Sequence, residues 1–391
     1  MRIDKSLNNT MSNVTYCDFG DFGKQYRDYV HGYLSISVCL FGSLANIFNI
    51  CVLRTKNMRS PTNCILTGLA LADLLVMLQY VPFTIHRNMA PHPLHYTHFN
   101  YSWAVFYKFH SLFTLVLHFI ACSLTIILAV WRYVFVTQVI SNRICSNHRR
   151  TVLVIVMTYV MCPLMCFPIL STLEITPYQQ TCTSEGMIVD RDQRHKYNFS
   201  DLRNQTVYVL YLNDPYNLSI WIYTVLLKFV PCLLLTLLSN KINCALMEAK
   251  RRRMKLLSGN KKLAEDDVTK KASAVQVYRE NQADRTTHML LAVLILFLVT
   301  EFPQAILGLI SAVLGKIFLK ECYAPLGDVM DIMALINSSI NFILYCTMSR
   351  QFRTTFQDMF HLKEIFGWIR KPSSRSCLAE ETRAETKMSL V

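Results

Sequence analysis

The stretch 124–136, LTIILAVWRYVFV, ends a long apolar run that begins near Trp103, and Arg132 stands where that run gives way to polar and basic residues. Residues spaced by three and four lie on one face of an α-helix. Counting back from Arg132 in such steps gives Ala129, Thr125, Cys122, His118 and Thr114. Eighteen residues at about 1.5 Å each span roughly 27 Å, close to the hydrocarbon thickness of a bilayer. The stretch therefore predicts a membrane-crossing helix with a fixed cation at one end and polar groups toward the other.

The composition of the whole chain indicates a membrane protein. Of its 391 residues, 52% are hydrophobic and 17% are charged, whereas a soluble domain is nearer a quarter charged. Apolar runs of this length predict membrane spans. We predict seven, near 31–54, 62–86, 103–136, 150–173, 217–247, 285–314 and 322–348. The predicted fold is an all-α, seven-transmembrane helix bundle over 31–348.

Basic residues predict the orientation of the chain. They follow the first, third, fifth and seventh spans: Arg54, Lys56, Arg59, Arg143, Arg149, Arg150, Lys250, Arg251, Arg252, Arg253, Arg350 and Arg353. By the positive-inside rule the N-terminus lies outside the cell and the C-terminus in the cytoplasm. The net charge of +14 is mostly this asymmetry, so we do not interpret it as nucleic-acid binding.

Glycosylation sequons agree with that orientation. Six Asn-x-Ser/Thr sequences fall on predicted outside segments, at Asn8, Asn13, Asn100, Asn198, Asn204 and Asn217. Residues 1–30 lack a basic segment, apolar core and cleavage site in that order, so no cleavable signal peptide is expected. This segment is predicted to be an extracellular, glycosylated N-terminus.

One carboxylate lies in the middle of the second span. An isolated Asp73 there costs several kcal/mol unless it has partners or water. Asn46 in span one and Asn337 and Asn341 in span seven are the candidates. The cluster has two interpretations, a cation-binding site or a structural hydrogen-bond network, and the sequence leaves both open.

Several motifs now stand in a specific order. They are LALADLL in span two, WRY at the end of span three, Pro231 in span five, Phe297 and Pro303 in span six and NFILY in span seven. Over about residues 30–360 the chain resembles rhodopsin-like G-protein-coupled receptors. The resemblance implies a heterotrimeric G protein and arrestin as partners and a sodium ion near Asp73, with no other cofactor. It assigns signalling roles to Trp131, Arg132, Tyr133, Asn341 and Tyr345.

Three positions depart from the usual receptor pattern. Trp131 replaces the acid before the arginine, Phe342 replaces a proline, and Glu301 replaces a tryptophan. The segment FLVTEFPQ (297–304) together with WRY is similar to the invertebrate group of myosuppressin, FMRFamide-like and sex-peptide receptors, which includes nematode dromyosuppressin-receptor-related proteins. That likeness implies a plasma-membrane receptor for a short amidated neuropeptide. Since Trp131 cannot restrain Arg132, we predict that Asp284 does so.

Ionisable groups in the outer halves of the spans are the candidate ligand site. Glu301 either meets the ligand or pairs internally with Lys228 or His118. Asp328 and Asp331 lie one turn apart near the outer end of span seven, and we expect them to be more accessible and to bind a ligand guanidinium. Further polar and aromatic candidates are Thr114, Tyr80, Phe83, Phe113 and Phe302.

Three cysteines lie on predicted outside segments, Cys17, Cys182 and Cys322. In an oxidising space they allow one bridge and one unpaired thiol. The related receptors usually link the outer end of span three to the second outside loop, but no cysteine lies near Tyr107, the expected position. We favour Cys182 as one partner, because its loop, about 174–216, is long; its mate is Cys17 or Cys322.

The loops and tail carry further patterns. TVYVLYL (206–212) predicts a hairpin strand, the alternative being a disordered glycosylated loop. The inside loop 248–284 is expected to extend spans five and six as helices around a flexible centre. Residues 349–362 predict an amphipathic helix on the membrane surface, and 363–391 a disordered cytoplasmic tail.

The last four residues, MSLV, are similar to ligands of PDZ domains through Ser389 and Val391. Candidate phosphorylation sites for arrestin recruitment precede them, at Ser373, Ser374, Ser376, Thr382 and Thr386.

Other functions fit the sequence less well. A transporter or channel is the main alternative, but we find no internal repeat. A retinal protein needs a lysine in the last span, and 322–348 contains none. No metal-ligand spacing, nucleophile elbow or phosphate-binding loop predicts an enzyme.

Overall fold

The computed structural model describes residues 16–89, 95–137, 148–189, 201–212, 221–260 and 267–361. Within these ranges, seven helices are long and apolar enough to cross a membrane. Their spans are Tyr29–Leu53, Pro61–Asn88, Tyr101–Phe135, His148–Ile169, Ile222–Glu248, Leu291–Leu314 and Glu321–Met348. Each lies on one of the seven predicted spans, which confirms the predicted fold class.

The helical elements follow the chain in order. Those that carry the spans are α2 (Gly32–Leu53), α3 (Pro61–Asn88), α4 (Tyr101–Thr137), α6 (His148–Leu170), the π-helix η6 (Ile222–Phe229) with α8 (Val230–Asn260), α9 (Asp267–Leu314) and α11 (Ala324–Met348). Shorter elements are α1 (Gly20–Tyr26), η1 (Arg27–His31), η2 (Lys56–Met58), η3 (Tyr96–Phe99), α10 (Lys316–Phe318), η7 (Leu319–Tyr323) and α12 (Arg350–Met359).

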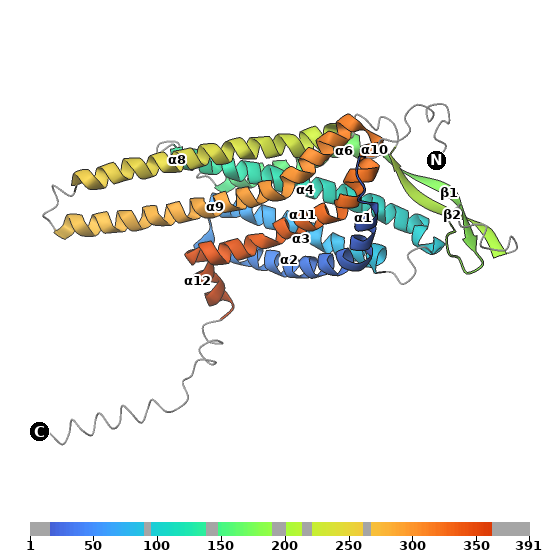
Figure 1. The fold of residues 1–391 in the computed structure, drawn as a ribbon. Helices are drawn as coiled ribbons and strands as arrows, with labels where there is room; N and C mark the ends of the chain where they lie inside the picture. The colour runs from blue at the N-terminus through green and yellow to red at the C-terminus, as the bar shows by residue number, and fades with distance from the viewer. Residues whose placement is uncertain are drawn as a thin grey trace, which may run out of the picture.

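The seven long helices run side by side, and the two ends of the bundle differ (Figure 1). At one end, which we call the hairpin end, lie α1 and a two-stranded sheet. At the other, the α12 end, α8 and α9 project well beyond their neighbours as two paired helices. This confirms that the segment 248–284 extends both helices; its centre, 261–266, lies outside the described residues.

Helix starts follow capping chemistry. Ser60 accepts a hydrogen bond from the backbone N–H of Asn63 at 3.1 Å, and Pro61 occupies the first helical position of α3. Asn100 accepts from the N–H of Trp103 at 2.9 Å before α4. Ser349 accepts from the N–H of Phe352 at 3.2 Å and so separates α12 from α11. Each cap satisfies a donor that the first helical turn leaves unpaired.

The turn before Pro231 is wider than an α-helix. Proline lacks an N–H and its ring clashes with the carbonyl four residues earlier. The π-helix η6 ends at Phe229, two residues before Pro231, and a π-turn is one way to accommodate such a break. The helix η6 places Thr224, Leu227 and Lys228 in the buried interior.

The second loop at the hairpin end forms an antiparallel hairpin. Strand β1 (Leu173–Thr183) pairs with β2 (Leu202–Leu212) over eleven residue pairs, from Leu173 opposite Leu212 to Thr183 opposite Leu202. The strand predicted at 206–212 is therefore confirmed and is longer than predicted.

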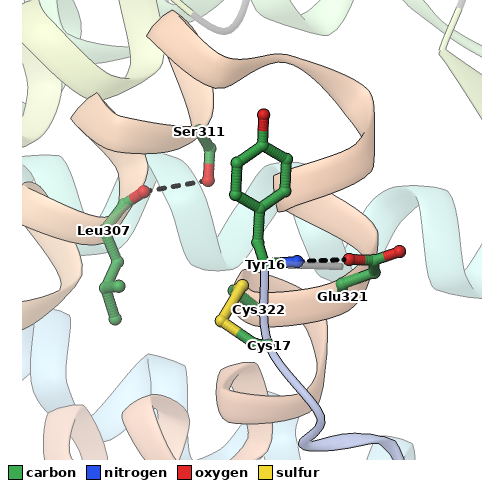
Figure 2. The surroundings of a disulfide bond; sticks show 6 residues. All are labelled: Tyr16, Cys17, Leu307, Ser311, Glu321 and Cys322. Atoms are coloured by element: carbon green, nitrogen blue, oxygen red, sulfur yellow. Dashed lines mark hydrogen bonds between the residues drawn. A yellow bond between two sulfur atoms is a disulfide. The ribbon is translucent and has the colours of Figure 1, made fainter. Parts of the chain in front are cut away.

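The predicted disulfide partner Cys182 is wrong. The bridge joins Cys17 to Cys322, whose Cα atoms lie 5.3 Å apart (Figure 2), within the range that a disulfide spans. Cys182 lies in β1, is fully buried, and forms no disulfide with any described cysteine. The argument failed because strand pairing, and not a covalent link, anchors the long loop.

The amphipathic helix after the last span is present as α12. Its Phe352 is 1% exposed and packs against Tyr345 and Phe342. Arg353 donates hydrogen bonds to the carbonyls of Cys346 and Thr347 at the end of α11, at 3.0 and 2.7 Å. The ring of Phe342, which stands where related receptors have proline, thus helps to fix α12 to the bundle.

Candidate functional site

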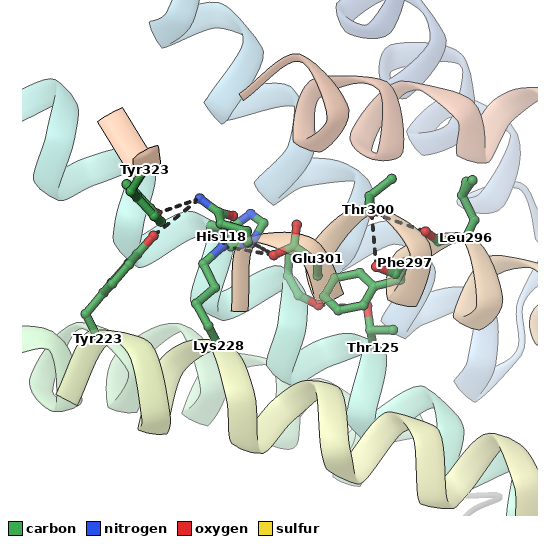
Figure 3. Close-up of polar contacts among 11 residues, drawn as sticks. His118, Thr125, Tyr223, Lys228, Leu296, Phe297, Thr300, Glu301 and Tyr323 are labelled. Carbon is green, nitrogen blue, oxygen red and sulfur yellow. Dashed lines mark hydrogen bonds and ion pairs between the residues drawn. The ribbon is translucent and has the colours of Figure 1, made fainter. Parts of the chain in front are cut away.

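Three ionisable side chains from three elements meet inside the bundle (Figure 3). Glu301 of α9 accepts hydrogen bonds at its Oε2 from Lys228 Nζ of η6 and from His118 Nε2 of α4, each at 2.9 Å. Glu301 is 1% exposed and Lys228 is 5% exposed. A buried carboxylate of this kind is tolerated only when it is paired. The predicted internal pairing of Glu301 is confirmed, and it involves both candidate partners.

A layer of polar groups extends this charge cluster toward the hairpin end. Lys228 Nζ also donates to Gln304 Oε1 at 2.8 Å. The Gln304 amide nitrogen in turn lies 3.5 Å from the hydroxyls of Tyr223 and Tyr323. Glu301 Oε1 is buried and has no hydrogen-bond partner in the part of the chain that the structure describes. Glu301 therefore uses only one of its two carboxylate oxygens for the described hydrogen bonds.

Asp328 differs from its prediction. Its Oδ2 accepts from Arg27 Nε at 2.7 Å and its Oδ1 lies 3.5 Å from Arg87 Nη2. The Asp328 side chain is only 5% exposed, so the expected accessibility is wrong. The sequence argument missed both arginines, because it treated residues 1–30 as a tail and did not consider Arg87 at the end of α3 as a partner.

Asp331 lies one turn further along α11 and is partly exposed. Its Oδ2 accepts a hydrogen bond from the Tyr80 hydroxyl at 3.3 Å. Tyr80 also lies 3.2 Å from His31 Nε2. Its ring packs edge-on against Phe83, with ring centroids 5.4 Å apart. Tyr80 thus lies beside this carboxylate, and Phe83 packs against Tyr80.

The other residues predicted to bind the ligand do not all lie beside Asp331 and Tyr80. Phe302 follows the buried Glu301 but is 40% exposed on α9, and Phe113 stacks on the exposed ring of Phe109 at 5.1 Å. Thr114 has a buried hydroxyl without a hydrogen-bond partner among the described residues. Sequence reasoning also missed His110, whose ring stacks on Phe83 with centroids 3.9 Å apart.

A small cavity lies deeper in the bundle. It measures about 20 Å³ and is lined by Asp73, His118, Asn337, Ser338, Asn341, Leu69, Ala121, Thr125, Val293 and Phe297. Asn341 donates to Asp73 Oδ2 at 3.3 Å, and Asn46 donates to the Ser338 carbonyl at 3.0 Å. The structure therefore brings Asp73, Asn337 and Asn341 to one cavity, with Asn46 bonded to its wall. A volume of this size holds about one water-sized particle.

Arg132 lies toward the α12 end on α4. Its Nε is buried without a hydrogen-bond partner in the described part of the chain, and its guanidinium carbon lies 6.0 Å from the Phe135 ring centroid. Its two neighbours in sequence pack against different hydrophobic clusters of the bundle, Trp131 against one that includes Leu128 and Tyr133 against one that includes Ala129. The side chain of Asp284, its predicted partner, lies outside the described residues.

These features define a class of protein. Seven membrane helices enclose a buried charge cluster near one end and a polar cavity at an aspartate, and an arginine stands near the other end. The class is that of the rhodopsin-like G-protein-coupled receptors.

Comparison with known proteins makes the family specific. A family model, the serpentine type 7TM GPCR chemoreceptor Srw, matches residues 33–363, and the chain belongs to this family. It is 30% identical to the G-protein coupled receptor dmsr-1 of Caenorhabditis elegans, over 85% of this chain and 68% of that protein. It is 26% identical to the sex peptide receptor of Drosophila melanogaster, over 89% and 77%. It is 23% identical to the human thyrotropin-releasing hormone receptor, over 85% and 78%.

Proposed function

We propose that this protein is a plasma-membrane receptor for a short amidated peptide of the FMRFamide or myosuppressin type and that it activates a heterotrimeric G protein. Relatives named as receptors for sex peptide and for thyrotropin-releasing hormone support a receptor role over a transporter or channel. The observation that carries the peptide proposal is the carboxylate of Asp331, a partly exposed residue, at the hydroxyl of Tyr80. A carboxylate next to an aromatic ring suits a guanidinium followed by a phenyl group.

The test is the substitution Asp331→Ala. A charge-assisted hydrogen bond is worth about 1.5–3 kcal/mol, so the half-maximal concentration of an amidated Arg-Phe peptide should rise roughly tenfold or more. The readout is guanine-nucleotide exchange on added G protein in membranes. Glu174→Ala, in β1, is the matched loss of an acid outside the bundle and should leave the response unchanged. An unchanged dose–response for Asp331→Ala contradicts the proposed contact.

We also propose a sodium ion for the Asp73 cavity. The lining offers one carboxylate, two hydroxyls and amide oxygens, which are the hard donors that such a cation prefers. A cavity of about 20 Å³ suits one small ion. Bound there, the cation would neutralise Asp73, and Asn337, Ser338 and Asn341 would supply neutral oxygen ligands.

The proposed topology places the hairpin end outside the cell. Asn100 and Asn204 are exposed at that end, which supports their glycosylation. The other sequons, at Asn8, Asn13, Asn198 and Asn217, lie outside the described residues.

The C-terminal tail, with Ser389, Val391 and the candidate phosphorylation sites, also lies outside the described residues. We propose that the tail binds a PDZ domain and, after phosphorylation, arrestin. A tail peptide with a free C-terminal carboxylate should capture a PDZ protein, and the C-terminal amide should not, because the carboxylate enters a nest of backbone N–H groups. Equal capture by both forms contradicts this binding mode.

A further inference from the structure

The segment Tyr16–His31 is fastened to the hairpin end of the last membrane helix. The Cys17–Cys322 disulfide joins it to η7, and the backbone N–H of Tyr16 donates to the Glu321 carboxylate at 3.1 Å (Figure 2). The Tyr16 ring packs edge-on against Phe318 with centroids 5.8 Å apart. The start of the segment is thus held in place by a covalent bond and two non-covalent contacts.

Helix α1 then packs directly on α11. A Cβ added to Gly23 would lie 2.8 Å from Pro325 Cβ and 2.9 Å from its Cα and carbonyl oxygen. Only glycine allows this approach. The close contact carries α1 along α11 toward Asp328, which lies one turn beyond Pro325 on the same helix.

One turn after Gly23, Arg27 reaches that carboxylate. Its Nε donates to Asp328 Oδ2 at 2.7 Å, and its backbone carbonyl accepts from Asn88 Nδ2 at 3.3 Å. The Arg27 side chain is 38% exposed, whereas that of Asp328 is 5% exposed. The Arg27 guanidinium therefore lies between the buried Asp328 carboxylate and the solvent.

Asp328 and Asp331 are the two carboxylates predicted to bind a ligand guanidinium, and a guanidinium of the chain itself already holds the outer one. Asp331 lies three residues, about 4.5 Å, further into the bundle on α11. A peptide that enters from the hairpin end reaches Arg27 and Asp328 before it reaches Asp331. Arg27 occupies the place that a cationic group of the peptide would take first.

We propose that Arg27 is a tethered occupant of a guanidinium-binding subsite at Asp328, which an arginine-containing peptide must displace in order to hold its guanidinium between Asp328 and Asp331. This inference rests on the proposed function. Arg87, 3.5 Å from Asp328 Oδ1, stays in place during the exchange, so no buried charge is left unpaired. The disulfide keeps the displaced Arg27 nearby at high effective concentration. The apparent affinity for the peptide then equals the intrinsic affinity multiplied by the fraction of molecules in which Asp328 is free of Arg27.

The test compares Arg27→Gln with the unmodified chain, using Phe-Met-Arg-Phe-amide and its analogue with citrulline in place of arginine. Citrulline has a similar shape but no charge. With the arginine peptide, the half-maximal concentration for nucleotide exchange should fall about fivefold in Arg27→Gln, the effect expected for losing one partly exposed ion pair. With the citrulline peptide the change should be less than about twofold. Arg27→Lys, which keeps the charge, should behave like the unmodified chain.

Two measurements separate this inference from the receptor proposal. Hydrogen exchange of the α1 amides without any peptide should become faster in Arg27→Gln and remain unchanged in Gln25→Ala, an exposed position on the same helix. Unchanged exchange in Arg27→Gln, an unchanged or weaker response to the arginine peptide, or an equal gain with both peptides overturns the inference. Failure of both peptides to activate the unmodified chain counts instead against the proposed peptide class.

Discussion

The substitution Glu301→Gln tests the buried charge cluster directly. It removes the carboxylate that accepts hydrogen bonds from Lys228 and His118 and leaves the Lys228 ammonium without a counter-ion in a site that is 5% exposed. Removing one partner of a buried ion pair costs about 3–5 kcal/mol. Gln304 still accepts one bond from Lys228 at 2.8 Å, so we expect a loss near the lower limit, about 3 kcal/mol.

The assay is the thermal midpoint of the purified receptor in detergent micelles. At about 2–4 °C per kcal/mol, a loss of about 3 kcal/mol lowers the midpoint by roughly 6–12 °C. The exposed Glu185 supplies the control: Glu185→Gln should leave the midpoint within about 1 °C, because surface substitutions rarely change stability much. The double variant Lys228→Met/Glu301→Gln removes both charges and should be more stable than Glu301→Gln alone.

The same substitution should change signalling. The cluster joins α4, α9 and the η6–α8 helix, so its loss removes a restraint between three helices of the bundle. We expect higher basal nucleotide exchange in Glu301→Gln. A melting midpoint within about 2 °C of the unmodified receptor, together with unchanged basal exchange, would refute this account of the cluster.

Three further predictions concern other parts of the chain. Asp73→Asn should abolish any effect of sodium on agonist potency while surface expression persists; loss of expression would favour a structural role. Asp284→Asn should raise basal nucleotide exchange if Asp284 restrains Arg132, and unchanged basal and stimulated signalling contradicts that pairing. Burial raises the pKa of the Cys182 thiol, which lowers the fraction of reactive thiolate at pH 7.4. Native receptor should therefore resist a membrane-impermeant maleimide at Cys182, with labelling that increases as the pH rises, and prompt labelling at pH 7.4 that is absent in Cys182→Ser would contradict this.

The membrane helices could be predicted because bilayer thickness imposes their length and composition locally in the sequence. The strand at 206–212 could be predicted for a similar reason, since its β-branched and aromatic residues stand together. The Cys17–Cys322 bridge could not, because its partners are separated by 305 positions and three thiols on predicted outside segments allow several pairings. In that case local composition gives no information about which segments meet in space.

The two aspartates of α11 show the same limit at the candidate site. Both were recognised as ionisable groups near the end of a membrane helix. Whether each is accessible depends on a segment more than 290 positions earlier, which brings Arg27 onto Asp328 but not onto Asp331. The sequence therefore identified the charges, and tertiary packing decided which of them is already paired.

His118 connects the two polar regions of the bundle. Its Nε2 bonds to Glu301, and the same side chain lines the cavity that contains Asp73. In a medium of low dielectric constant, a change in charge or position at one group alters the energy of the next. A ligand that displaces Lys228 or moves Glu301 therefore changes the surroundings of His118. If the proposed cation binds beside Asp73, its binding energy changes as well. By linkage, a cation beside Asp73 must change the affinity for that ligand by the same factor, so substitution of His118 should weaken both effects together.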